Sequence, residues 1–113
     1  MDIPVDMTNL RSMTDGDREV EAVLFTEFCR AFEEGLAILA ASCEESGQQP
    51  WRSQAHALKG IALNLGADRL SSLCRQAQEQ FEIDTAEKQA LLAQLRVAYE
   101  EVRRFLEQEM NGN

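Results

Sequence analysis

Apolar residues recur every three or four positions along most of the chain, and few turn-forming residues interrupt them. This spacing is typical of amphipathic helices, because an α-helix completes one turn in about 3.6 residues. No stretch alternates between apolar and polar residues for long enough to predict a sheet. The plausible breaks are Pro4, Asp15-Gly16, Ser46-Gly47 through Pro50, Gly66 and Ile83-Asp84. The pattern therefore predicts an all-α fold.

Five helices are expected between these breaks. The first is short, from about Asp6 to Met13, with Asp6 available as its N-cap. The four longer helices are expected from about 17 to 45, from near Pro50 to Gly66, from Asp68 onward, and from after Asp84 or Thr85 to about Glu109. Gly66 suits a left-handed C-cap, and Pro50 suits a first helical turn. Four long helices with short connections favour an antiparallel four-helix bundle with a short extra N-terminal helix.

The apolar stripes indicate which helix faces are buried. In the second helix the stripe consists of Val20, Leu24, Phe28, Ala31, Gly35, Leu39 and Ser42. The apolar arc of this helix is wider than the stripe, which predicts packing against two other helices or, alternatively, a part that docks a partner. The inward positions of the fourth and fifth helices are Leu70, Leu73, Cys74, Ala77 and Phe81, and Leu91, Leu92, Leu95, Ala98, Tyr99, Val102 and Leu106.

The size and charge of the chain limit what it can do. Its 113 residues fit one domain, with residues 1–5 and 110–113 expected to be flexible ends. A net charge of −9 disfavours binding to nucleic acid or to an anionic membrane surface. No apolar run approaches the ~20 residues of a membrane span, and residues 1–10 lack the features of a signal peptide, so we expect a cytoplasmic protein. The three cysteines form no Cys-x-x-Cys pair and are expected to be buried, reduced thiols.

The third helix carries the only histidine of the chain. Its core-facing positions are Trp51, Leu58, Ile61, Ala62 and Leu65. His56 lies opposite this stripe, and the residues within about 60 degrees of it around the helix are Arg52, Ser53, Lys59, Gly60 and Leu63. The spacing therefore predicts that the imidazole points into solvent. A single exposed histidine is normally an ordinary surface residue, so its neighbours have to decide whether it has a function.

Those neighbours favour phosphate chemistry at His56. Lys59 and Arg52 each lie one turn away and can place a cation beside a phosphoryl group on the ring. A glycine inside a helix costs about 1 kcal/mol relative to alanine, and Gly60 would leave room for another protein's backbone to approach the imidazole. Leu63 adds an apolar side chain to the exposed face, where a docking patch would need one.

The run from His56 to Ala67, followed by Leu70, Leu73 and Cys74, resembles the signature of histidine-containing phosphotransfer (HPt) domains. The helix pattern is similar to that fold over nearly the whole chain. The resemblance implies that His56 is the phosphorylated residue, that Lys59 is the cation beside the phosphate and that Gly60 is the gap for an incoming receiver domain. Gln78 stands where some members carry a glutamine that hydrogen-bonds the imidazole. Ile61 departs from the pattern, because many members have a small or hydroxyl residue there.

The family's chemistry implies a phosphate carrier without kinase activity of its own. A receiver-domain aspartate, on a response regulator or hybrid sensor kinase, would give its phosphoryl group to His56, and another would accept it. The chain shows no carboxylate cluster beside His56 on its helix, so no metal site is predicted and the receiver would supply Mg²⁺.

We expect a monomer that docks through Leu63, Ala67, Met13 and Leu10, together with part of the second helix. The alternative is a helical protein-interaction module of the same fold without phosphotransfer.

Overall fold

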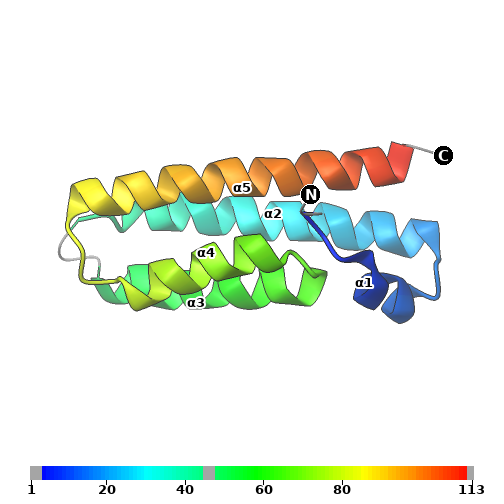
Figure 1. The fold of residues 1–113 in the computed structure, drawn as a ribbon, viewed down its shortest axis with the longest axis horizontal. Helices are drawn as coiled ribbons and strands as arrows, with labels where there is room; N and C mark the ends of the chain where they lie inside the picture. The colour runs from blue at the N-terminus through cyan, green and yellow to red at the C-terminus, as the bar shows by residue number, and fades with distance from the viewer. Residues whose placement is uncertain (1–3, 45–47, 112–113) are drawn as a thin grey trace.

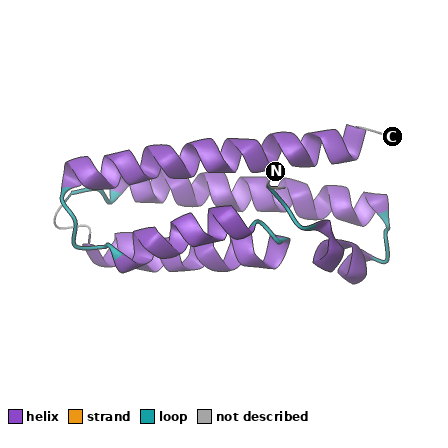
Figure 2. Cartoon of the chain, in the orientation of Figure 1, coloured by secondary structure: helices purple, strands orange, loops and turns teal. Residues whose placement is uncertain are grey.

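A computed structural model describes residues 4–44 and 48–111, and five helices account for most of them (Figures 1 and 2). They are α1 (Met7–Thr14), α2 (Arg18–Ala41), α3 (Gln48–Leu65), α4 (Asp68–Glu79) and α5 (Thr85–Asn111). The all-α prediction is confirmed. The first helix also begins as expected, because the Asp6 carboxylate accepts a hydrogen bond from the Thr8 backbone N–H at 3.0 Å.

The second helix ends earlier than predicted, at Ala41 instead of near Glu45. The Ser42 hydroxyl donates a hydrogen bond to the Ile38 carbonyl at 2.8 Å, and the Ser42 backbone N–H donates to the Leu39 carbonyl. These bonds satisfy carbonyls that the helix end leaves free. Cys43 follows outside the helix and is nevertheless buried. The predicted turn residues Ser46 and Gly47, like Glu45, lie outside the described residues.

Four of the helices lie side by side along the long axis of the molecule, and each runs opposite to the one before it in the chain (Figure 1). Contacts join α2 to α3, α3 to α4, α4 to α5 and α5 back to α2. The bundle measures 46 × 25 × 18 Å. Because α2 and α5 are longer than α3 and α4, they extend past the α3–α4 turn, and α1 packs there against α2 and α3.

The buried side chains form one hydrophobic cluster to which all five helices contribute. At its centre the ring of Phe32 in α2 stacks on Tyr99 in α5, with centroids 5.2 Å apart. On the other side, the indole N–H of Trp51 donates a 2.9 Å hydrogen bond to the Ala77 carbonyl, which joins α3 to α4. All of the inward positions predicted for the fifth helix are buried.

The buried face of α2 differs from the predicted stripe at its N-terminal end. Val20 and Leu24 are exposed, and Glu21 and Phe25 are buried instead. The cause is that α1, not α3, covers this part of α2. Glu21 can be buried there because its carboxylate accepts a hydrogen bond from the Thr14 hydroxyl of α1 at 3.2 Å.

The turn between α3 and α4 depends on Gly66, whose φ of +94° lies in the left-handed region. Its carbonyl accepts a hydrogen bond from the Asp6 N–H at 2.9 Å, so the N-terminal segment closes over the turn. A Cβ at Gly66 would overlap the Asp6 carbonyl oxygen. The predicted left-handed C-cap is confirmed, and glycine is required there for a second reason, the close approach of Asp6.

The described residues near both ends of the chain belong to the helical fold or its core. Val5 is buried in the core, and Met110 and Asn111 continue α5. The expected flexibility of residues 1–5 and 110–113 stays a prediction, and residues 1–3, 112 and 113 lie outside the described part. Among the helices that the structure describes, none has the length and apolar character needed to span a bilayer.

Candidate functional site

His56 lies on the exposed face of α3, as predicted. The face opposite to it is buried through Trp51, Ala55, Leu58, Ala62 and Leu65. Ile61, which was expected in this stripe, is only half-buried, and Ala55 takes its place in the core. The imidazole therefore belongs to the outer surface of the bundle and not to its interior.

Gly60 leaves open space one turn from His56. A Cβ built at this glycine would meet nothing within 4 Å. Gly35 in α2 has the opposite role, because a Cβ there would overlap Leu58 Cδ2 and lie 2.8 Å from Gln54 Nε2. Gly35 thus lets α2 pack closely against α3 on the side away from the imidazole. Packing does not require a glycine at position 60, whereas it does at position 35.

Lys59 is half-buried, and its backbone is held from α4. The buried Ser71 hydroxyl donates a hydrogen bond to the Lys59 carbonyl at 3.3 Å. This bond fixes α4 beside the turn of α3 that follows His56. Sequence reasoning missed Ser71, and the available signal was weak: a small polar residue directly after Leu70 in the apolar stripe of α4.

Gln78 of α4 is half-buried and faces α3. At 100 degrees per residue it falls about 20 degrees from Ser71, which contacts α3 directly. The two helices run in opposite directions, so Gln78 lies nearer than Ser71 to the start of α3. This placement orients Gln78 toward the helix that carries His56.

Arg52 is engaged with an aromatic ring near the end of α4. Its guanidinium carbon lies 5.0 Å from the centroid of the Phe81 ring, within the range of a cation–π contact. The described structure thus holds this cation on Phe81, at the N-terminal side of His56. Lys59, on the C-terminal side, has no such anchor among its described contacts.

The predicted docking residues divide into two exposed and two buried side chains. Leu63 is 56% exposed and Met13 is 63% exposed. Leu10 and Ala67 are 2% and 0% exposed, so the prediction that they contact a partner is wrong. Leu10 lies on the inner face of α1, and Ala67 is enclosed by the α3–α4 turn, where its N–H donates to the Ala62 carbonyl at 2.9 Å.

Three exposed apolar side chains share one edge of α2. They are Val20, Leu24 and Ile38. All three fall within about 60 degrees of Gly35, the α2 residue that meets α3, and on the far side of it from the buried Phe25 and Leu36. They therefore share one edge of α2: Ile38 lies one turn from Gly35, where α2 meets α3, whereas Val20 and Leu24 lie in the part of α2 that α1 covers. The wide apolar arc of this helix was the sequence signal for them.

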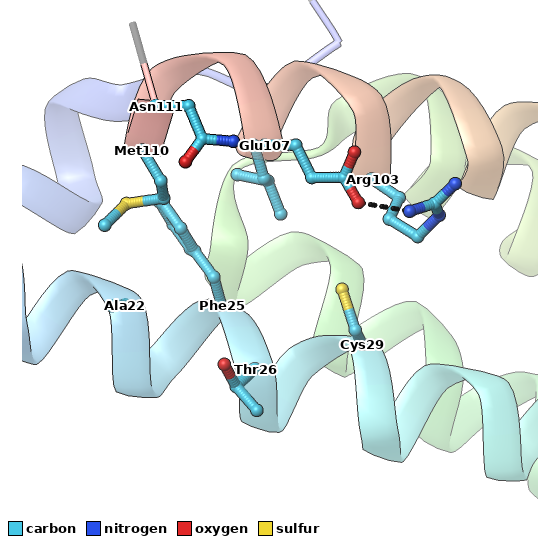
Figure 3. A pocket seen from close by; sticks show the side chains of 9 residues that line it. Ala22, Phe25, Thr26, Cys29, Arg103, Glu107, Met110 and Asn111 are labelled. Carbon is cyan, nitrogen blue, oxygen red and sulfur yellow. Dashed lines mark hydrogen bonds and ion pairs between the residues drawn. The ribbon is translucent and has the colours of Figure 1, made fainter. Parts of the chain in front are cut away.

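A separate groove of about 420 Å³ lies between α2 and the C-terminal half of α5 (Figure 3). Its lining includes Phe25, the half-buried Cys29 and Met110, and Arg103 is paired there with Glu107. No residue of α3 or α4 lines this groove. It is therefore distinct from the surface that surrounds His56.

The three cysteines are free thiols. Cys43 and Cys74 are buried as expected, whereas Cys29 is only half-buried. Burial raises the pKa of the Cys74 thiol to about 12. Within residues 4–44 and 48–111, no three His, Cys, Asp or Glu side chains are grouped so that they could hold a metal ion.

Comparison with known proteins gives one finding. The family model described as "Hpt domain" matches residues 23–109, which include all of α3 and α4 and most of α2 and α5. Neither the curated proteins nor the solved structures give a match. The matched region contains the exposed His56, the open position at Gly60 and the helices that hold them. Because the match covers most of its length, the chain belongs to the Hpt domain family.

Proposed function

We propose that this protein is a phosphorelay carrier that accepts a phosphoryl group on His56 and passes it to an aspartate of another protein. Hpt domains act in histidine phosphotransfer between the proteins of two-component systems, as carriers and not as kinases. The observation that supports the proposal most directly is the exposed imidazole of His56 on α3, with unoccupied space at Gly60 one turn away.

The proposed step is an in-line transfer at phosphorus. The unprotonated ring nitrogen of His56 attacks an aspartyl phosphate, and the N–P bond forms as the P–O bond to the aspartate breaks. The aspartate carboxylate leaves with the electron pair, and the other ring nitrogen keeps its proton. In the return step a different carboxylate attacks, and the electron pair of the N–P bond returns to the ring. Such a transfer needs positioning and charge neutralisation more than a buried base.

The residues around His56 can supply both requirements. Lys59 would neutralise the charge of the phosphoryl group, and Gln78 would orient the imidazole from α4. Arg52 contributes positive charge from its place on Phe81. Mg²⁺ would come with the receiver domain, which holds it beside its own aspartate.

The docking surface that we propose is apolar and borders the α3 face. It consists of Leu63, Met13 and the α2 residues Val20, Leu24 and Ile38, all of which are exposed. The partners would be receiver domains of response regulators and of hybrid sensor kinases, met in the cytoplasm by a monomer. A relay has to release its partner as readily as it binds, so the interface should bury less than about 1,200 Å².

The test is incubation with a receiver domain carrying a radioactive aspartyl phosphate and Mg²⁺, using the wild type and His56→Gln. Label on the wild type alone, acid-labile and base-stable, is the expected result. Label retained by His56→Gln would overturn the assignment of the site. Wild-type protein that binds receivers and takes up no label from any of them would instead indicate an interaction module of the same fold.

A further inference from the structure

We propose that Arg75 of α4 is a second cation that binds the phosphoryl group on His56. This inference rests on the proposed function and adds a residue to the same site. Arg75 lies outside the helix that carries the histidine and is exposed, and its guanidinium meets only Glu79 among the side chains of the described residues. Its position relative to His56 follows from how α3 and α4 are joined.

Two hydrogen bonds fix the alignment of these helices along their axes. Ser71 is joined to the Lys59 carbonyl at 3.3 Å, and the Ala77 carbonyl is joined to Trp51 at 2.9 Å. His56 lies three residues before Lys59, and Arg75 lies four residues after Ser71. Because the helices run in opposite directions and each rises 1.5 Å per residue, the first bond places the Cα atoms of His56 and Arg75 about 1.5 Å apart along the bundle axis. The second bond, counted in the same way, places them about 4.5 Å apart, so the two residues lie within one helical turn of the same level.

The rotation of α4 then sets the direction in which Arg75 points. Ser71 faces α3, and Arg75 falls about 40 degrees from it around the helix. This 40-degree offset is away from the buried stripe of Leu70, Cys74 and Ala77, hence toward solvent. The Arg75 side chain therefore projects from α4 above the groove between α3 and α4, on the side of the bundle where His56 is exposed.

The present partner of Arg75 can be exchanged at little cost. The Arg75 Nε and the Glu79 carboxylate are 3.3 Å apart, and both side chains are about two-thirds exposed, at 69% and 64%. Exposed pairs of this kind contribute roughly 0–1 kcal/mol. A phosphoryl group with a charge near −2 offers several acceptor oxygens to one guanidinium and binds it more strongly than a solvated carboxylate does.

Arg52 lies on the same side of His56 as Lys59 around α3, and its guanidinium rests on Phe81. Lys59 from α3 and Arg75 from α4 would then hold the phosphate charge from the two walls of one groove. Gly60 falls on the opposite side of His56 from Lys59 around α3, so the approach of a receiver and the cations would not compete for the same space.

The experiment compares Arg75→Gln with Arg69→Gln as a matched control. Arg69 is on the same helix and equally exposed, at 68%, but it faces α5, where it lies 3.9 Å from Glu101. Single-turnover transfer from a phosphorylated receiver is measured over a range of receiver concentrations. We expect Arg75→Gln to lower the rate at saturating receiver about tenfold, the size of one charge-assisted hydrogen bond, and Arg69→Gln to leave it unchanged.

Three further results decide the matter. Glu79→Gln, which frees Arg75, should match or exceed the wild-type rate, and a loss like that of Arg75→Gln would overturn the proposal. A normal transfer rate of Arg75→Gln at saturating receiver would also overturn it. If only the receiver concentration needed for half-maximal rate changed, Arg75 would contact the partner and not the phosphate. Wild-type protein that takes up no label contradicts the proposed function itself, so the two failures are distinguishable.

Discussion

The Ser71 hydroxyl donates a hydrogen bond to the Lys59 carbonyl across 3.3 Å, and it does so from a buried position on the helix opposite His56. The bond lies next to Gly60, a residue type that weakens a helix, and it joins this turn of α3 to α4. It also determines which residues of α4 face His56. The spacing between the two helices at the site is therefore set by a small hydroxyl and not only by apolar packing.

Replacing Ser71 by alanine should lower the free energy of unfolding by about 1 kcal/mol, the net contribution of one hydrogen bond. Urea denaturation followed by circular dichroism measures this change. Ser72→Ala is the matched control, because Ser72 is the next residue and is exposed. Equal stability of the two variants would show that the bond to Lys59 contributes nothing.

A long side chain at Gly60 should block the approach of a receiver while leaving the fold intact. The structure has free space at this position, so Gly60→Gln will be accommodated and its helical circular dichroism should match the wild type. Transfer from a phosphorylated receiver should be at least about tenfold slower, because a displaced reacting group loses the in-line geometry. A normal transfer rate in this variant would contradict the access argument.

Alanine at Gly60 and alanine at Gly35 should change stability in opposite directions. Gly60→Ala should stabilise the protein by about 0.5–1 kcal/mol, since alanine favours the helix and its methyl group meets nothing. Gly35→Ala should destabilise it by about 1–3 kcal/mol, because the methyl group would overlap Leu58. Thermal unfolding of the two variants checks both signs, and shifts in the same direction would be inconsistent with this packing.

Substitutions at Leu63 and Leu10 should have different effects, the first on receiver binding and the second on stability. Leu63→Asp should weaken receiver binding with little loss of stability, because the side chain is 56% exposed. Leu10→Ala should cost about 2–5 kcal/mol of stability, since this leucine is in the core. Calorimetric titration and denaturation measure the two effects, with the exposed Val97→Asp on α5 as the docking control. Equal weakening by Val97→Asp would contradict the proposed surface.

The buried Cys74 should make stability fall at high pH. Burial raises the pKa of this thiol from 9.0 to about 12, so between these values the unfolded chain loses a proton that the folded chain keeps. Ionisation then favours the unfolded state, and stability decreases as the pH rises through this window. Cys74→Ala should flatten that decline. In the folded protein at pH 8, a thiol reagent should modify the half-buried Cys29 well before Cys74.

The features that local periodicity controls could be predicted from sequence. The exposed face of α3 and the inward face of α5 depend on the 3.6-residue repeat alone, and His56 was placed correctly for that reason. The left-handed Gly66 followed from helix-end chemistry. The exposure or backbone conformation of these residues can be predicted without knowing which helix packs beside them.

The errors arose where a tertiary neighbour decides burial. Leu10 was predicted to be exposed because the eight residues of α1 do not by themselves show how this helix packs on α2 and α3. Val20 was assigned to the core because α2 carries more apolar residues than the bundle can cover. Arg75 was not singled out because sequence shows only cations one turn away on the same helix, whereas Arg75 reaches the site from α4.

The closure of Asp6 over Gly66 connects the N-terminal segment to the geometry of the proposed phosphate site. Whatever pulls on the first residues, such as a fused domain, an affinity tag or a bound protein, acts on the loop from which α4 departs. A strain applied there would alter how Gln78 and Arg75 stand relative to the imidazole without touching any of these side chains. Comparing phosphotransfer by versions of the protein extended at one end or the other would reveal this mechanical sensitivity.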